Sequence, residues 1–123
     1  MSSVVDRFLR YVKIDTKSDD RTGTSPSTAK QHNLAKVLTE ELTELGIAEV
    51  TYDTEHCYVY AAIPASAGCE NAPALGFIAH MDTSPAVTGE NIKPHRVVNY
   101  DGKNVLLNEE KEIWLTVEDF RNF

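Results

Sequence analysis

The feature that most restricts the fold of this chain is the apolar run Ala74–Ala79, with the sequence Ala-Leu-Gly-Phe-Ile-Ala. A strand with one face in water alternates apolar and polar side chains, whereas a continuous apolar run needs cover on both faces. The run therefore predicts a buried strand in the middle of an α/β sheet. It ends abruptly at the polar sequence His80-Met81-Asp82.

Two helices are predicted before this run. Ser3 is a candidate cap for the first helix, whose apolar residues recur at helical spacing (Val4, Val5, Phe8, Leu9 and Val12). Residues 15–27 are rich in Asp, Ser, Thr and Gly and predict a loop. Ser25-Pro26-Ser27-Thr28 then marks the start of a second helix, which is expected to reach Leu45 and to end at Gly46.

Beyond Gly46 the pattern changes from helical to β. Val50–Tyr52 and Tyr58–Ile63 predict two strands, with residues 53–56 as a hairpin loop between them. Residues 64–73 are small, polar and bounded by prolines, which is typical of a surface connection.

A second hairpin is predicted further along the chain. Asp101-Gly102 is a turn signal, and it lies between Arg96–Tyr100 and Asn104–Leu107, which we expect to pair. Helices before and after β-rich segments give an α/β fold class.

Composition and charge exclude several classes of protein. With 123 residues, 41% hydrophobic and 25% charged, the chain suits one globular domain. Its net charge of -7 repels phosphate backbones, so nucleic acid is excluded as a partner. No apolar run approaches the roughly 20 residues that span a bilayer, and no secretory signal is evident at the start. Cys57 and Cys69 lack CxxC spacing, which predicts free thiols and a cytoplasmic location.

His80 and Asp82 are the residues whose types and spacing point to metal chemistry. Side chains alternate along a strand, so both would lie on one side at the carboxyl end of the predicted strand, where α/β sheets bind ligands. A neutral imidazole is a good zinc ligand, and a carboxylate beside it fixes its tautomer. By themselves, however, a histidine and an aspartate two positions apart favour an incidental pair, because the pattern is common.

Other polar residues receive structural interpretations. His32 is expected on the surface of the second helix, opposite the leucine face, His56 in a turn and His95 in a loop. Glu109-Glu110 sits in a charged run, so a solvated loop or helix start is favoured over a catalytic pair. Cys57 is interpreted as a small apolar residue that fills space in a strand.

Four segments together resemble the peptidase T family of dinuclear zinc exopeptidases. They are GFIAHMDTSP (Gly76–Pro85), RFLRYVKIDTKSD (Arg7–Asp19), PSTAKQHNLAKVLTEELTELG (Pro26–Gly46) and NIKPHRVVNYDG (Asn91–Gly102). Their order and spacing are similar to those of the family over most of the chain. The match favours this family over the related desuccinylases, deacylases and carboxypeptidases, which share the His-x-Asp motif.

The resemblance implies a fold, an activity and a role for each motif residue. The fold is the zinc-exopeptidase catalytic domain, a central mixed sheet flanked by helices, with residues 1–123 as its amino-terminal part and the dimerisation domain absent. The complete enzyme is implied to be a cytoplasmic, homodimeric hydrolase with two zinc ions per active site, a metallo-aminopeptidase that releases the amino-terminal residue of tripeptides. By this resemblance His80 binds a metal ion and Asp82 is catalytic.

The remaining residues of such a site cannot be placed in this chain. The family also uses a bridging aspartate, a Glu-Glu pair, another acidic ligand and a distant histidine, so the second zinc site is not encoded here and the isolated chain is expected to be inactive. Two alternatives stay open. One is a related zinc amidohydrolase or deacylase, and the other is a non-catalytic truncated α/β domain that self-associates through exposed apolar surface.

Overall fold

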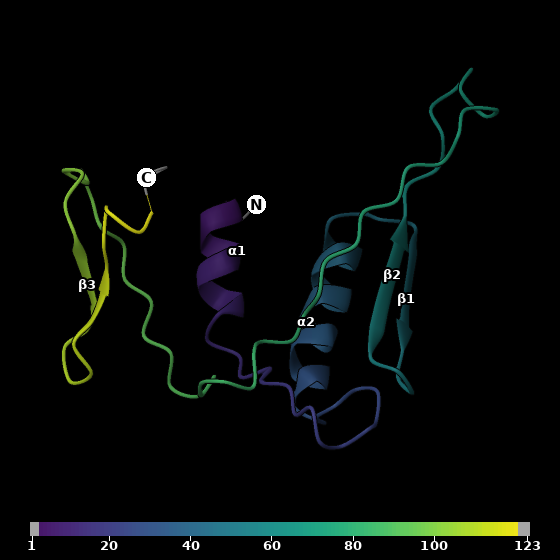
Figure 1. Cartoon of the computed structure of the whole chain (residues 1–123). Coiled ribbons are helices and arrows are strands. Elements are labelled where there is room, and N and C mark those ends of the chain that lie inside the picture. Colours follow the sequence, from purple (N-terminus) through teal and green to yellow (C-terminus); the bar gives the residue numbers. More distant parts are fainter. Residues whose placement is uncertain (1–2, 121–123) are drawn as a thin grey trace.

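The computed structural model describes residues 3–120, which form two helices and two antiparallel hairpins (Figure 1). The elements, in chain order, are α1 (Val4–Tyr11), α2 (Gln31–Glu44), β1 (Glu49–Asp53), β2 (Tyr58–Ala62), β3 (Val105–Asn108) and β4 (Ile113–Leu115). The α/β fold class is therefore confirmed. Within the described residues, no helix has the length and apolar character needed to cross a bilayer.

Helix α1 begins at the predicted cap. The Ser3 hydroxyl accepts a hydrogen bond from the Asp6 amide at 3.1 Å, and the Asp6 carboxylate accepts one from the Ser3 amide at 3.0 Å. These reciprocal bonds satisfy amide groups that a helix start leaves unpaired. The hydrogen bond that the Asp6 carboxylate accepts from the Ser3 hydroxyl, followed by the one from the Ser3 amide, lowers the pKa of Asp6. The apolar side of the helix, including Val4 and Phe8, remains exposed.

Helix α2 begins at Gln31, later than the predicted start at Ser25–Thr28. The predicted caps are engaged elsewhere, because the Thr28 hydroxyl donates to the Lys17 carbonyl and the Ser27 hydroxyl accepts from the Asp19 amide. The prediction for the other end is confirmed. Gly46 follows the helix with φ +81°, a left-handed conformation that glycine adopts without steric cost.

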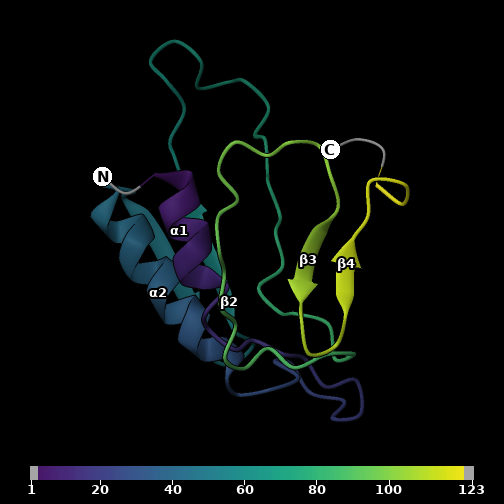
Figure 2. The ribbon, with the colours of Figure 1, turned by 90° about the vertical axis from the view of Figure 1, so that its left-hand side faces the viewer.

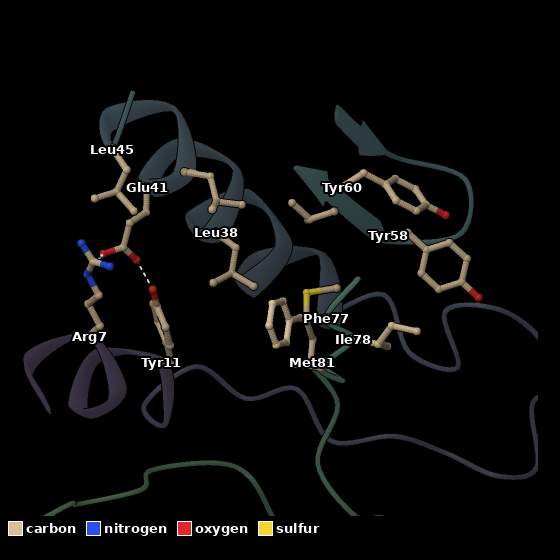
Figure 3. A pocket seen from close by; sticks show the side chains of 13 residues that line it. Arg7, Tyr11, Leu38, Glu41, Leu45, Tyr58, Tyr60, Phe77, Ile78 and Met81 are labelled. Atoms are coloured by element: carbon tan, nitrogen blue, oxygen red, sulfur yellow. Dashed lines mark hydrogen bonds and ion pairs between the residues drawn. The ribbon is translucent and has the colours of Figure 1, made fainter. Parts of the chain in front are cut away.

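A buried carboxylate joins the two helices (Figure 3). Glu41 of α2 is 8% exposed and forms ion pairs with Arg7 at 2.9 Å and Arg10 at 2.7 Å, and it also accepts a hydrogen bond from the Tyr11 hydroxyl. The Tyr11 hydrogen bond, followed by the hydrogen bond and charge of Arg10, lowers the pKa of Glu41. Side chains of α1 thus stabilise the ionised form of the Glu41 carboxylate of α2.

The first predicted hairpin is confirmed. Strands β1 and β2 pair antiparallel, with Glu49 opposite Ala62 and Asp53 opposite Tyr58, and both strands contact α2. In the loop between them, the Asp53 carboxylate accepts hydrogen bonds from the amides of Glu55 and His56. Among the described residues, the buried apolar side chains are those of Leu34, Ala35 and Cys57.

The second hairpin forms in a different place from the one predicted. Strand β3 pairs with β4 through a turn at residues 109–112, and Arg96–Tyr100 is not a strand. Asn99 has φ +54°, a left-handed conformation that interrupts an extended segment. The interpretation of Glu109-Glu110 as a solvated loop is confirmed, since both residues are exposed in this turn. Figures 1 and 2 show the hairpin standing apart from α1 and α2.

The prediction of a buried strand at Ala74–Ala79 is wrong for this structure. The segment has no strand assignment, and Leu75, Phe77 and Ile78 are 79%, 90% and 101% exposed. Within residues 3–120 the sheets are two separate two-stranded hairpins, and a central mixed sheet is not present. The physical reason is that an apolar run shows a preference for burial, whereas a strand also needs neighbouring strands to accept its backbone hydrogen bonds.

We expect Glu41→Gln to lower the free energy of unfolding by about 2 kcal/mol, because it removes the charge from hydrogen bonds to a buried group. Urea denaturation followed by circular dichroism measures the loss. Glu40→Gln, on an exposed position of the same helix, is the control and should change stability by less than about 0.5 kcal/mol.

The Glu41 contribution should also depend on pH. Because its pKa is lowered in the folded chain, the stability it provides is fully present above the ordinary pKa of glutamate and is lost as the pH falls through the lowered value. The two proteins should therefore converge in stability in acid. A difference that persisted there would show that the loss comes from packing and not from charge.

The exposed apolar segment predicts self-association of the 123-residue chain. Phe77→Ser combined with Ile78→Ser should reduce the association that appears as concentration rises, because these changes remove apolar surface from water contact. Sedimentation velocity at several concentrations measures the effect. Val87→Ser changes another exposed apolar residue, outside this segment, and should leave association unchanged; a monomeric parent chain at every concentration would contradict the prediction.

Candidate metal centre

His80 and Asp82 lie in contact, in the extended segment that follows Ala74–Ala79. The His80 Nδ1 atom lies 2.8 Å from the Asp82 carbonyl oxygen and 3.1 Å from its carboxylate Oδ1. Both oxygens are acceptors, so Nδ1 must carry a proton and donate. In the neutral ring the Nε2 lone pair is then available, and the ring is accessible because the His80 side chain is 84% exposed.

The loop after α1 binds Thr83, the residue that follows Asp82. Thr83 and Lys17 form a parallel β-bridge, in which the Thr83 amide donates to the Thr16 carbonyl and the Ser18 amide donates to the Thr83 carbonyl. Thr16 is buried. Two backbone hydrogen bonds therefore connect the His80–Asp82 segment to a part of the chain more than sixty residues earlier.

A cavity of about 460 Å³ lies beside the segment but does not include the pair (Figure 3). Its walls come from α1, α2, Leu45, β2, residues 77–79 and residue 81. Ala79 and Met81 line it, whereas His80 and Asp82 do not. From Ala79 to Asp82, every second residue therefore lines the cavity, as the alternation of extended backbone produces, although Phe77 and Ile78 line it as well. The cavity has a polar end at Arg7, Tyr11 and Glu41 and is mostly apolar elsewhere (Figure 3).

The other histidines lie outside this pair. His32 is half-buried and bonded through Nδ1 to the Tyr52 hydroxyl of β1, so the expectation of a surface residue is corrected, because the hairpin packs on this face of α2. His56 donates from Nδ1 to Asp53 in the hairpin loop, and this hydrogen bond raises its pKa. His95 is exposed.

The two cysteines are free thiols, as predicted. Cys57 is buried at the end of the hairpin loop, where burial raises the pKa of its thiol. A thiol in that state is a poor nucleophile and metal ligand. Cys57 is buried, in agreement with its interpretation as a space-filling residue, but it lies in the turn before β2 and not in a strand.

The chemistry of the pair fits one part of a zinc site. A neutral imidazole with a free Nε2, supported at Nδ1 by a carboxylate, is a common zinc ligand with its outer partner. A catalytic zinc usually has three protein ligands, and within residues 3–120 no group of three His, Cys, Asp or Glu side chains is placed to hold a metal ion. The described residues therefore offer His80 and Asp82, and no complete centre.

Residues around the pair that sequence reasoning missed are Asp15, Thr16, Ser18, Thr83 and Gly89. The Asp15 carboxylate forms an ion pair with Lys30, and Gly89 approaches both Asp15 and Thr83. Asp15 to Ser18 belong to a segment that contributes to the family resemblance. That membership was the available signal, but a loop rich in Asp, Ser and Thr does not reveal which distant residue it binds.

Curated proteins similar to this chain match nearly its whole length, although no family model matches it. Peptidase T of Clostridium acetobutylicum is 52% identical over 120 residues, which are 98% of this chain and 29% of that protein. Peptidase T of Alkaliphilus oremlandii is 50% identical over 121 residues, again 98% of this chain and 29% of the relative. Peptidase T of Desulfitobacterium hafniense (strain Y51) is 51% identical over 120 residues, 98% and 28% respectively.

The chain thus spans less than a third of the length of the curated relatives it matches. This share is consistent with the predicted correspondence to an amino-terminal part of such a protein. Over nearly all of its own length, the chain is therefore similar to part of proteins named peptidase T.

Proposed function

We propose that this chain provides His80 as a zinc ligand and Asp82 as an active-site carboxylate in a metallo-aminopeptidase of the peptidase T type. The observation that carries the proposal is the hydrogen bond from His80 Nδ1 to Asp82, which leaves Nε2 accessible for a metal ion. About 50% identity to proteins named peptidase T supports the reaction class, which is peptide hydrolysis.

In this proposal the two residues have separate tasks. Asp82 accepts the hydrogen bond from Nδ1 through both its carbonyl and its carboxylate, which selects the tautomer with a free Nε2 and makes that nitrogen more basic. His80 holds Nε2 toward solvent, where a metal ion can reach it. Zinc, when bound, polarises water and the peptide carbonyl for hydrolysis. The general base and the remaining ligands are not assigned to residues of this chain.

The proposed substrate of the whole protein is a tripeptide with a free amino end, from which the amino-terminal residue is released. The support for this specificity, for two zinc ions per site, for a homodimer and for a cytoplasmic location is the resemblance of the four sequence segments to the family. The 123-residue chain alone is proposed to be inactive, because its described residues contribute fewer than the three protein ligands of a catalytic zinc.

A segment exchange tests this function. The corresponding 120 residues of Clostridium acetobutylicum peptidase T are replaced by this chain, to which they are 52% identical. The chimera should bind zinc and release the amino-terminal residue of a tripeptide. His80→Ala should lower kcat/KM by about 100-fold or more and reduce the zinc content, whereas Asp82→Ala should cost about 10- to 100-fold, as outer partners of metal ligands do.

The matched control is His95→Ala, which removes an exposed loop histidine and should leave kcat/KM and zinc content unchanged. Cleavage of an acylated amino acid in place of a tripeptide would replace the proposal with the related deacylase activity. A folded, inactive chimera would favour the non-catalytic domain. Full activity of the 123-residue chain by itself would refute the part of the proposal that concerns the missing ligands.

A further inference from the structure

Thr83 is held more firmly than its exposed position suggests. Its amide donates to the Thr16 carbonyl at 3.1 Å. Its carbonyl accepts from the Ser18 amide at 2.9 Å and from the Ser18 hydroxyl at 2.8 Å. Three hydrogen bonds therefore fix the residue that immediately follows Asp82, and with it the direction of the Asp82 carbonyl that His80 uses.

The loop that makes these bonds is itself restrained. We call residues 15–18 the positioning loop. The Asp15 carboxylate accepts from the Lys17 amide at 3.0 Å through Oδ1 and pairs with Lys30 through Oδ2. The Thr28 hydroxyl donates to the Lys17 carbonyl at 2.7 Å. Thr28 and Lys30, which lie just before α2, thus contact both ends of the Asp15–Lys17 turn.

Gly89 closes the arrangement from the other side. A Cβ atom at this position would lie 2.5 Å from Asp15 Oδ1 and 3.5 Å from Thr83 Oγ1. The first distance is far below van der Waals contact, so any larger residue would displace the Asp15 carboxylate. Moving that carboxylate would disturb its hydrogen bond with the Lys17 amide or its ion pair with the Lys30 ammonium group. A side chain at this position would therefore act through its contact with the Asp15 carboxylate, and not through its φ angle.

We propose that Asp15 and Gly89 are positioning residues for the His80–Asp82 pair, and act on it through the positioning loop and Thr83. The chain of contacts runs from Gly89 to Asp15, from the positioning loop to the Thr83 backbone, and from there to Asp82 and His80. Neither residue touches the imidazole. The inference rests on the proposed function for its catalytic meaning, since the tautomer of His80 matters only if Nε2 binds a metal.

A spectroscopic measurement separates this role from a general contribution to folding. In the ¹⁵N-labelled 123-residue chain without metal, at a pH where imidazoles are neutral, ¹⁵N shifts report which ring nitrogen carries the proton. Wild-type His80 should be mostly the Nδ1–H tautomer. Gly89→Ala should convert it mostly to Nε2–H, because the nitrogen that carries the proton is set by the hydrogen bonds the ring makes.

Gly76→Ala is the matched control. Gly76 lies in the same extended segment and has no positive φ, and an added Cβ there would meet no heavy atom within 4 Å, so the tautomer should be unchanged. His56, whose Nδ1 donates to Asp53 in the hairpin loop, is an internal reference that should be constant in every variant. Asp15→Ala should weaken the Nδ1–H preference as Gly89→Ala does. The double variant should lose no more of the Nδ1–H tautomer than Asp15→Ala alone, because the carboxylate with which a Cβ atom at position 89 would clash is then absent.

An unchanged His80 tautomer in Gly89→Ala and Asp15→Ala, with His56 constant, would overturn the proposal. If Gly89→Ala fails to fold, Asp15→Ala decides the question by the same measurement. The test does not depend on zinc or turnover. A tautomer shift in the chain together with an inactive chimera would retain the positioning role and reject the proposed function. A fully active chimera, with no tautomer shift in the variants of the chain, would retain the proposed function and reject the positioning role.

Discussion

The bridge between Thr83 and the loop after α1 is the interaction on which the functional interpretation depends. It connects residues that are more than sixty positions apart, and it supplies hydrogen bonds to an extended segment that has no strand neighbour on either side among the described residues. Without it, the Asp82 carbonyl and carboxylate would be free to turn, and the imidazole of His80 would lose the acceptors that select its tautomer. A single point of attachment therefore restrains the segment that carries His80 and Asp82.

Polar contacts, and not an apolar core, connect the two helices. Only a few apolar side chains among residues 3–120 are buried, and the stripe of α1 faces solvent. The attachment of α1 to α2 depends instead on the Glu41 carboxylate and its three partners on α1. A buried charge of this kind is costly unless it is fully paired, so the arrangement fixes the geometry of the two helices at a modest gain in stability.

The segment Ala74–Ala79 has the composition of a buried strand but is exposed in this structure. Its composition is that of a strand covered on both faces, yet Phe77 and Ile78 lie in solvent beside the cavity formed with α2 and β2 (Figure 3). In the longer curated relatives, the region that matches this chain is less than a third of the sequence. The apolar pattern therefore indicates what the segment needs, and the described residues do not provide it.

The sequence by itself determined the features that depend on neighbours within a few positions. These are the Ser3 cap, the stop at Gly46 and the hairpin loop built on Asp53, which all depend on residues two or three positions apart. The start of α2, the place of the second hairpin and the fate of Ala74–Ala79 were mispredicted, because they depend on which partner is within reach. Only the tertiary structure decided that Thr83 meets Thr16 and that Gly89 meets Asp15. Such contacts arise when the chain returns to itself, and no periodicity or local propensity encodes that return.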